Sequence, residues 1–490
     1  MTQTTGADTS PTVLAVSNDS LLLGLLSLFL GGSIWYFLAH NKKKRSPTLP
    51  YPIQPPNPHF LLGHAKLLDH TKGPHFDIKL LELAKQLGGV FSLQVPVLVA
   101  KTNATYGTVE QGTMIVVADP ALIKHVTVTK NFPKSWTMKK NIPLFGETSI
   151  LLQGDEAWKR LRKTFAPGFT TSFLKDMVAV MCDKLDRFME CIEQEDVRAN
   201  QPTQMMTRAQ TFTSDVIVQI AFGEDWGGTK PHDARGYITE ITEGVIFADK
   251  DIKTKLFGWE HRRRMKVLEA KIDEVMQQVL DRRLGQLDTK GKINGASTTN
   301  STTTTRNFAN VCTLAIDSMR KERPDGVLTE EDRTVIVHQL KTFYFAGHDT
   351  TATTISWAIW LLSQHPNVLE KLRAELRDRQ IFSTPEQRPT YEQLQQCEYL
   401  EAILKEVLRL YPPERFVGVP PEEYADKYIP FLKGPRVCLG KYFALLEAKL
   451  AISALAQRYD MSCVNPNETI SYRITTSPLD GARVQLSMRK

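Results

Sequence analysis

The stretch "PFLKGPRVCLG", from Pro430 to Gly440, places one cysteine in a short segment rich in glycine and cationic residues. Gly434 and Gly440 permit backbone angles and close approaches that other residues do not. A thiolate held in such a loop binds iron well and accepts hydrogen bonds from inward-turned backbone N–H groups. A single cysteine is more often a small buried core residue than a ligand, so the rest of the chain must decide between these two interpretations.

The side chains around the cysteine favour a ligand loop. An arginine supplies a cation where the acidic edge of a cofactor would lie, and a phenylalanine can pack against the sulfur or against a flat ring. The ordered pattern Phe-x-x-Gly-x-Arg-x-Cys-x-Gly is far more specific than the cysteine alone. Its members are Phe431, Gly434, Arg436, Cys438 and Gly440.

The composition describes a large chain with a small charge excess. At 490 residues and 42% hydrophobic, it can bury a large core, and length alone predicts two or three domains. The six cysteines lack paired spacing, which favours a reducing compartment over a disulfide framework. Lys42–Arg45 supply four of the net +7 charges, and the remainder is too small to predict a nucleic-acid partner.

The N-terminal region predicts a membrane anchor. Residues Leu21–Leu38, "LLLGLLSLFLGGSIWYFL", carry no charge and would span about 27 Å as a helix, close to the hydrocarbon thickness of a bilayer. A basic run follows this segment instead of preceding it, which argues against a cleaved signal peptide. The same run orients residues 1–20 to the lumen and the bulk of the chain to the cytosol. Residues 39–59, basic and then proline-rich, predict a stiff linker.

The remaining chain predicts two strands followed by many helices. Val90–Val95 and Thr113–Ala118 are rich in β-branched residues, which favours strands. From about Pro120 onward the pattern is mostly helical. Residues 295–307, "GASTTNSTTTTRN", are polar and of low complexity, and we interpret them as a disordered loop.

One predicted helix is unusually long. Thr329 and Asp332 approximate a capping box at its start, and Pro366 marks its end. A helix of about 35 residues is far longer than the average and would cross an entire domain. Gly347 at its middle costs about 1 kcal/mol relative to alanine, and threonine hydroxyls bonded to the preceding turn can bend a helix. We therefore expect a functional reason for this local irregularity.

The cysteine pattern matches in full the haem-binding signature of the haem-thiolate monooxygenases, so the chain resembles the cytochrome P-450 family. The resemblance implies that Cys438 is the axial thiolate ligand of the iron of haem b. It covers essentially Pro47–Lys490. It also implies one mainly α domain with a small β region over residues 60–490, behind the N-terminal transmembrane helix, in place of two or three domains.

The segment "AGHDTT" resembles the family's signature on the helix at the distal side of the haem, opposite the cysteine ligand. In the family, the residues equivalent to Ala346 and Gly347 form a groove for oxygen. Those equivalent to Asp349 and Thr350 relay protons during oxygen activation. These four positions are therefore expected on the haem side of the long helix.

Two further segments match in the expected order. "WKRLR" implies that Trp158 and Arg162 contact haem propionates, since both are donors on one helical face. "EVLR" carries Glu406 and Arg409, which in the family form a buried pair joined by an arginine from a "PERF"-like segment, here Arg415. Each pair alone is common by chance, and the ordered set is what carries the resemblance.

The chain departs from the family pattern at "LRLYPPERFVGVPP", residues Leu408–Pro421. The family separates "LRLYPP" from "PERF" by several tens of residues, whereas here the two segments are fused. The missing part normally contains strands that line the substrate pocket, so its neighbours would keep open edges. We hypothesise an internal deletion at residues 412–414, in a splice variant or a gene model with a lost exon.

The resemblance implies a single-pass monooxygenase of the endoplasmic reticulum membrane that hydroxylates or epoxidises an apolar substrate with O2. Electrons would come from NADPH through a diflavin NADPH–cytochrome P-450 reductase, with cytochrome b5 as a further partner. Lys433, Lys441 and Lys449 would attract an acidic partner to the face behind the cysteine.

By family analogy, the substrate pocket would be lined by the loop after Phe132, the face around Phe343–Phe345 and the segment Thr475–Pro478. The sequence does not identify the substrate.

Two alternatives remain open from the sequence. The first is a haem-thiolate isomerase or dehydratase of lipid peroxides, which needs no external electrons. Such enzymes usually lack the acid–alcohol pair, so Asp349 and Thr350 count against it. The second is a non-functional isoform that lacks part of the haem pocket, and the fused segment is its support.

The deletion hypothesis predicts a specific result for the transcript and its genomic locus. If an exon has been lost, the locus will contain coding sequence for several tens of residues between the codons of Pro412 and Glu414. Sequencing both nucleic acids checks this expectation. Continuous coding with no intervening sequence at that position would count against the hypothesis.

Overall fold

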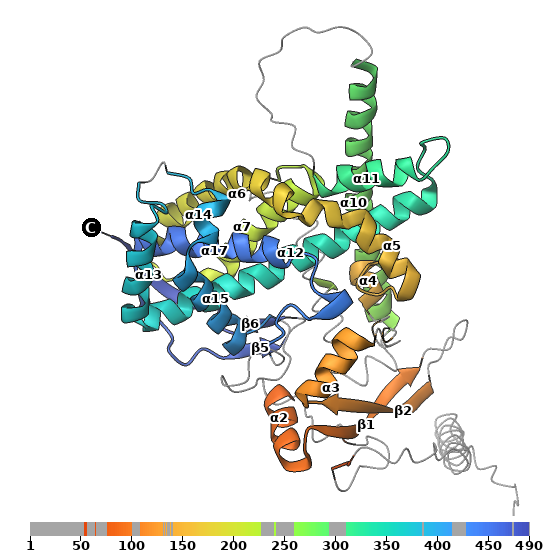
Figure 1. The fold of residues 1–490 in the computed structure, drawn as a ribbon, viewed down its shortest axis with the longest axis horizontal. Coiled ribbons are helices and arrows are strands. Elements are labelled where there is room, and N and C mark those ends of the chain that lie inside the picture. Colours follow the sequence, from red (N-terminus) through yellow and green to blue (C-terminus); the bar gives the residue numbers. More distant parts are fainter. Residues whose placement is uncertain are drawn as a thin grey trace, which may run out of the picture.

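The computed structural model describes residues 53–55, 64, 76–99, 108–130, 132, 134, 138, 141–226, 240–241, 259–293, 310–384, 387–413, 428–472 and 475–489. Most of these residues form helices around one long central helix, and the strands form three small sheets (Figure 1). The expected mainly α class with a small β region is therefore confirmed for the described chain.

The predicted anchor Leu21–Leu38 and the loop 295–307 lie outside the described residues. Only residues 53–55 of the proline-rich linker are described. Within the described part of the chain, no helix has the length and apolar character needed to cross a membrane.

The helices account for most of the chain and are named here by their bounds. The α-helices are α2 (Phe76–Leu87), α3 (Pro120–Lys124), α4 (Ile142–Phe145), α5 (Asp155–Phe165), α6 (Thr171–Ile192), α7 (Met205–Ile217), α10 (Trp259–Ile293), α11 (Val311–Lys321), α12 (Glu330–Gln364), α13 (Pro366–Asp378), α14 (Tyr391–Gln395), α15 (Glu398–Leu410) and α17 (Lys441–Arg458). The short 3₁₀ and π segments are η2 (His125–Thr129), η4 (Ala166–Phe169), η5 (Glu193–Val197), η6 (Val218–Phe222) and η8 (Gly434–Arg436).

The strands form three separate antiparallel sheets among the described residues. Their strand orders are β1-β2, β3-β7-β4 and β5-β6. The strands are β1 (Val90–Val99), β2 (Thr108–Val117), β3 (Thr203–Gln204), β4 (Tyr459–Cys463), β5 (Ile470–Tyr472), β6 (Thr476–Pro478) and β7 (Arg483–Met488). Figure 1 shows β1, β2, α2 and α3 together at one end of the molecule, below the main helical body.

The sheet β1-β2 confirms both predicted strands; β1 continues to Val99, and β2 begins at Thr108 and ends at Val117, one residue before the predicted end. The register pairs Val90 with Val117 and Val99 with Thr108. Outside this pairing, the amide of Ser92 donates to the carbonyl of Ile53 at 3.1 Å, and the amide of His64 donates to that of Gln94 at 2.7 Å. In the described chain, β1 therefore shares a sheet with β2 alone. The hydrogen bonds to Ile53 and His64 satisfy part of its other edge.

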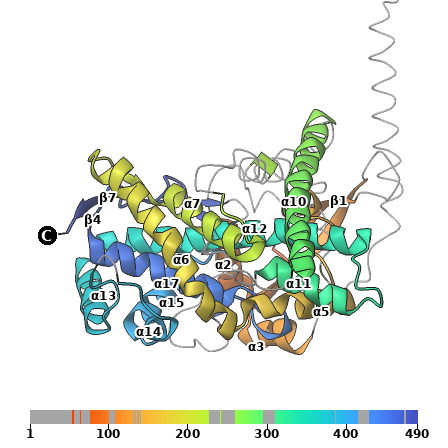
Figure 2. The same ribbon diagram turned by 90° about the horizontal axis from the view of Figure 1, so that it is seen from above.

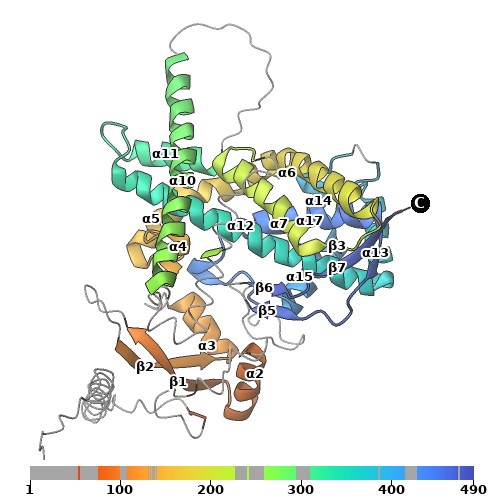
Figure 3. The same ribbon diagram turned by 180° about the vertical axis from the view of Figure 1, so that it is seen from behind.

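Helix α12 forms where the sequence predicts it and runs through the centre of the helical body (Figures 1 and 2). The capping box is present, since the Thr329 side chain accepts from the amide of Asp332 and the Asp332 carboxylate accepts from the amide of Thr329. His365 ends the helix directly before Pro366. Figure 2 shows α10 standing across α12, while Figure 3 shows α7 and α17 alongside it.

The irregular middle of α12 is helical without interruption from Glu330 to Gln364. A Cβ atom on Gly347 would lie 2.6 Å from Cγ1 of Ile217 on α7, so glycine here permits a close helix–helix approach. The threonine hydroxyls bond back to the preceding turn as expected, with Thr350 donating to the carbonyl of Ala346 at 2.7 Å. The sequence irregularity thus corresponds to a packing contact between α7 and α12.

Glu447 of α17 is a buried carboxyl group that faces Thr351 of α12. Its side chain is 0% exposed, and its two oxygens have no hydrogen-bond partner within 3.5 Å in the described chain. Burial raises the pKa of Glu447 well above its ordinary value, and the nearby Thr351 hydroxyl acts in the opposite direction. The folded protein therefore keeps this group protonated at pH values at which the unfolded chain ionises it.

Replacing Glu447 with glutamine, an uncharged side chain of similar shape, is expected to stabilise the fold at neutral pH. Because the folded-state pKa lies above the unfolded-state value, the stability of the natural chain falls as pH rises from the unfolded-state pKa toward the folded-state pKa. The variant Glu447→Gln lacks this loss. Its advantage in melting temperature should therefore grow between about pH 4 and about pH 7. The same advantage at both pH values would contradict the assignment of a neutral carboxyl group.

Candidate active site

The cysteine segment folds into a loop that contains η8 and ends directly before α17. The amide of Cys438 donates to the carbonyl of Phe431 at 2.8 Å and closes the loop. Gly434 has φ +67°, and a Cβ atom there would collide with the carbonyl oxygen of Thr127. Gly440 is the N-cap residue of α17. The two glycines thus serve a left-handed backbone position packed on η2 and the turn into α17.

Cys438 differs from the buried cysteines of the chain in its accessibility. Cys182, Cys312 and Cys397 are buried, whereas Cys438 is exposed. Burial raises the pKa of Cys182 and Cys312 to about 12 and that of Cys397 to about 11, so these three thiols are held neutral. The exposed thiol of Cys438 is a sulfur that a bound group can reach, in contrast to the inert core thiols.

Helix α5 lies against the cysteine loop and brings the guanidinium of Arg162 and the indole of Trp158 to the site. Arg162 donates from Nη1 to the carbonyl of Val437 at 2.8 Å. The guanidinium of Arg436 lies 4.0 Å from the centre of the Trp158 ring, and that of Arg162 lies 5.8 Å from it. Trp158 itself is 6% exposed. The expected pair on α5 therefore meets the loop arginine at one corner of the site.

The electrostatics of this corner fit an anionic group. Burial lowers the pKa of both Arg162 and Arg436, and the charge of Arg162 adds to the effect on Arg436. The nearby Cys438 acts in the opposite direction on Arg162. A negative partner stabilises the charged forms of two partly desolvated cations that lie close together. The residues present therefore fit a group that offers acidic side arms for the cations and an iron for the thiolate.

An aromatic cluster joins the cysteine loop to the middle of α12. Phe169 lies 5.6 Å from Phe343 on α12 and 6.4 Å from Phe443 on α17, measured between ring centres. A Cβ atom on Gly440 would lie 3.9 Å from the Phe169 ring. Phe165 of α5 packs edge-on against Phe343 at 5.3 Å. The loop, α5 and α12 are therefore joined by one set of ring contacts.

Asp349 is held by partners that the sequence did not reveal. Gln210 of α7 donates from Nε2 to one carboxylate oxygen at 2.9 Å, and the hydroxyl of Thr475 donates to the other. Ser477 lies 3.0 Å from the same Thr475 hydroxyl. The two contacts to Asp349 join residues that are more than a hundred positions apart in the chain, and no local pattern around Gln210 signals them.

Two expectations about other residues change in the structure, and a third falls on a residue that the structure does not describe. Glu406 and Arg409 form the expected pair, with contacts of 2.8 and 2.6 Å, but the Glu406 side chain is 53% exposed and the pair is not buried. Arg415 lies outside the described residues. Lys449 is 2% exposed and pairs with Glu401 at 2.9 Å, so it is a core cation and not part of a docking surface.

The expected substrate-lining residues divide into buried and exposed ones. Phe343 and Phe345 are 7% and 5% exposed and belong to the aromatic core, and Thr475 is 1% exposed. Phe132 is 57% exposed. The described structure therefore places the aromatic part of this set in packing contacts and leaves Phe132 at the surface.

Comparison with known proteins identifies the family. The family model described as "Cytochrome P450" matches residues 53–420 and 413–478, which together span most of the chain. The chain therefore belongs to the cytochrome P450 family and is a haem-thiolate monooxygenase by class, an oxidoreductase that uses O2 and receives electrons from a redox partner. Its cofactor is haem, bound in this family through a cysteine thiolate.

Individual relatives are similar to the chain over most of its length. Secologanin synthase 2 of Catharanthus roseus is 26% identical over 405 residues, which cover 70% of this chain and 72% of that protein. Human cytochrome P450 4V2 is 24% identical over 429 residues, covering 74% and 78%. Cytochrome P450 3A29 of Sus scrofa is 25% identical over 480 residues, covering 86% and 88%.

The close contact at Gly347 predicts a size limit on α12. The variant Gly347→Ala places a methyl group 2.6 Å from Ile217, and overpacking of this kind costs about 1–3 kcal/mol. We expect a lower melting temperature, which the second substitution Ile217→Ala should partly restore. Gly285→Ala on α10 is the matched control, because a Cβ atom there meets nothing within 4 Å. A melting temperature of Gly347→Ala equal to that of the control would refute the packing argument.

Proposed function

We propose that this chain is a membrane-anchored monooxygenase that binds haem through Cys438 and hydroxylates or epoxidises an apolar substrate. The observation that carries this proposal is the exposed Cys438 thiol in a closed loop beside the cations of Arg162 and Arg436. When bound, haem supplies oxygen activation, and a thiolate ligand favours O–O cleavage. The remaining chemistry belongs to the residues around it.

Binding and orientation of the cofactor fall to α5 and the cysteine loop. Trp158 and Arg162 offer an indole N–H and a guanidinium to the propionate groups, and Arg436 adds a third donor at the same corner. Phe431 closes the loop through its carbonyl, while Gly434 and Gly440 give it its shape. These contacts hold Cys438 at a fixed place relative to α5.

Proton delivery falls to Asp349 and Thr350 of α12, beside Ala346 and Gly347. The Thr350 hydroxyl donates to the carbonyl of Ala346, which leaves its oxygen free to accept a hydrogen bond from another group. The Asp349 carboxylate, held by Gln210 and the hydroxyl of Thr475, is the proton carrier next to it. Acid and alcohol at consecutive positions favour a monooxygenase over the isomerase or dehydratase.

Electron supply and location complete the proposal. The electron donor is NADPH through a diflavin cytochrome P-450 reductase, with cytochrome b5 as a second donor, at the endoplasmic reticulum membrane. Lys433 and Lys441 are partly exposed beside the cysteine loop and Tyr442 is 58% exposed there, which suits an acidic partner. The uncharged segment Leu21–Leu38 supports the anchor.

A second candidate is an isoform that has lost part of the haem pocket. The family model matches in two pieces, and these meet at residues 413–420, where the sequence fuses two segments that the family keeps apart. The partly exposed Glu406–Arg409 pair accords with the loss of neighbouring structure. In this case the chain would keep the signature residues and fail to retain haem.

A reduced, carbon-monoxide difference spectrum of the full chain tests the proposal. We expect the strongly red-shifted band of a haem-thiolate protein, and we expect Cys438→Ser to lose that band. Cys463→Ser is the matched control, because Cys463 lies on β4 and should leave the spectrum unchanged. NADPH-dependent product formation with the reductase present then separates a monooxygenase from an isomerase or dehydratase.

The other spectral outcomes are equally informative. A band at the ordinary position would mean that haem binds without a thiolate from Cys438. Absence of bound haem would reject the monooxygenase and support the shortened, non-functional isoform.

A further inference from the structure

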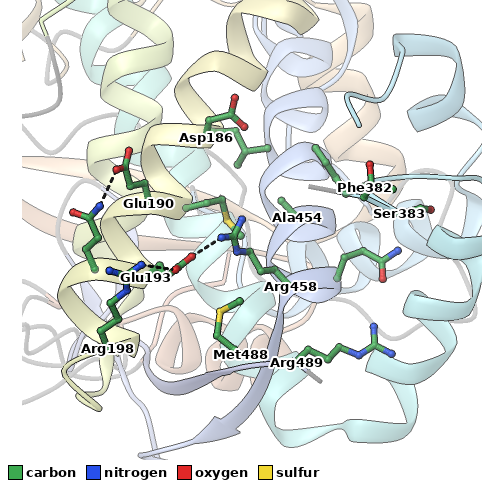
Figure 4. Close-up of a pocket in the computed structure, with 15 residues that line it drawn as sticks. Asp186, Glu190, Glu193, Arg198, Phe382, Ser383, Ala454, Arg458, Met488 and Arg489 are labelled. Carbon is green, nitrogen blue, oxygen red and sulfur yellow. Dashed lines mark hydrogen bonds and ion pairs between the residues drawn. The ribbon is translucent and has the colours of Figure 1, made fainter. Parts of the chain in front are cut away.

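A cavity lies at the end of α17 that is remote from Cys438. Its volume is about 600 Å³, it is partly open to solvent, and it is lined by α6 and η5, the segment after α13, the end of α17 and the end of β7 (Figure 4). Helix α17 starts three residues after Cys438, and its 18 residues correspond to about 27 Å of helix. The cavity is therefore separate from the candidate active site, and it has the size of a small-molecule site.

One part of the cavity lining is apolar. Leu185, Met189 and Ala454 line it with buried side chains, and Met488 on β7 is 47% exposed at its edge. Methionine side chains are flexible and polarisable, so they adapt to apolar ligands of different shapes. This surface suits a hydrocarbon chain.

Another part of the lining carries excess positive charge. Glu193 pairs with Arg198 at 3.0 Å and with Arg458, and these two guanidinium groups lower its pKa. The Nε atom of Arg458 is buried and has no acceptor in the described chain. Arg489 forms no ion pair with the residues drawn around the cavity (Figure 4). In this part of the lining, three guanidinium groups and one carboxylate leave a local excess of positive charge, while Asp186 and Glu190 line another wall of the cavity.

The remaining acidic residues lie on the wall formed by α6. Asp186 is paired with Arg388, and Glu190 accepts a hydrogen bond from Gln194 at 2.8 Å. Figure 4 shows Asp186 and Glu190 on the opposite side of the cavity from Arg489. An anionic group would therefore lie toward β7 and the end of α17, away from these carboxylates.

We propose that this cavity binds an amphipathic anion, with its hydrocarbon chain on Met189 and Met488 and its carboxylate or phosphate head on Arg458 and Arg489. Guanidinium groups form charge-assisted and often bidentate hydrogen bonds with both kinds of head group. A free fatty acid and an anionic membrane lipid share this chemistry. The site does not depend on bound haem or on turnover.

Photolabelling of the full chain in phosphatidylcholine vesicles tests this site. The probes are a diazirine-bearing dodecanoate added in solution and a diazirine-bearing phosphatidic acid in the vesicle, and mass spectrometry locates the labelled peptides. We expect label on the peptide that carries Met488 and Arg489 or on the facing part of α6. Labelling by the first probe alone identifies a free anion as the ligand, and labelling by the second identifies a lipid.

Charge variants decide whether the head group is recognised. Arg489→Gln is expected to reduce labelling by about tenfold or more, the usual effect of losing a hydrogen bond to a charged group. Arg483→Gln, on the strand β7 that Arg489 directly follows, is the matched control, since Arg483 does not line the cavity and pairs with Asp480. Met488→Glu, which adds a negative charge at the apolar wall, should likewise abolish labelling.

Three results would overturn the proposal. A diazirine-bearing dodecanol that labels the same peptides equally well would show that no anion is recognised. Equal labelling of Arg489→Gln and Arg483→Gln would show that the Arg489 guanidinium does not bind the head group. Label found only on peptides outside the cavity would place the ligand elsewhere. Melting temperatures of all variants are measured alongside, and Met488→Glu provides the charge test if Arg489→Gln does not fold.

Discussion

The burial of α12 is the constraint on which the rest of this structure depends. A helix of 35 residues crosses the domain, and its middle carries hydroxyl groups that would be costly to bury without partners. The helix satisfies most of them itself, because the side chains of Thr342, Thr350, Thr353 and Ser356 each donate to the carbonyl four residues earlier. A polar stretch can therefore pass through an apolar core.

The helices around α12 are fixed by buried cations as well as by apolar packing. Lys341 of α12 is 0% exposed and pairs with Asp273 of α10 at 2.7 Å, and Lys449 of α17 pairs with Glu401 of α15. Arg373 of α13 donates to the carbonyls at the end of α17 and the start of β4. Losing one partner of such a buried contact is far more costly than losing a surface ion pair. These contacts determine which helices lie next to one another.

The residues of the candidate active site are positioned by backbone and side-chain hydrogen bonds. The thiol of Cys438 is exposed, and the loop that carries it is held by its own backbone and by Arg162 of α5. The carboxylate of Asp349 on α12 is held by Gln210 and the Thr475 hydroxyl. The proposed thiolate ligand and the proposed proton carrier thus lie on different elements of the fold.

The sequence by itself determined the elements whose signals are local. The capping box at Thr329, the stop at Pro366 and the β-branched runs of β1 and β2 predict their elements correctly, because helix and strand propensities act over a few residues. The ordered cysteine pattern likewise predicted the family, since its glycine and arginine positions belong to one short loop. The structure confirmed the helix bounds and the existence of both strands, with β1 and β2 longer than predicted, and the family comparison confirmed the family.

Only the tertiary structure decided the contacts between distant segments. Nothing near Gln210 in the sequence indicates that it bonds Asp349, and the irregularity at Gly347 acquires its meaning from Ile217 on another helix. The same holds for Lys449, which looks like a surface cation in sequence and is buried in the fold. Local patterns specify which face of an element is apolar, whereas packing of whole elements decides which side chains meet, and that depends on the entire chain at once.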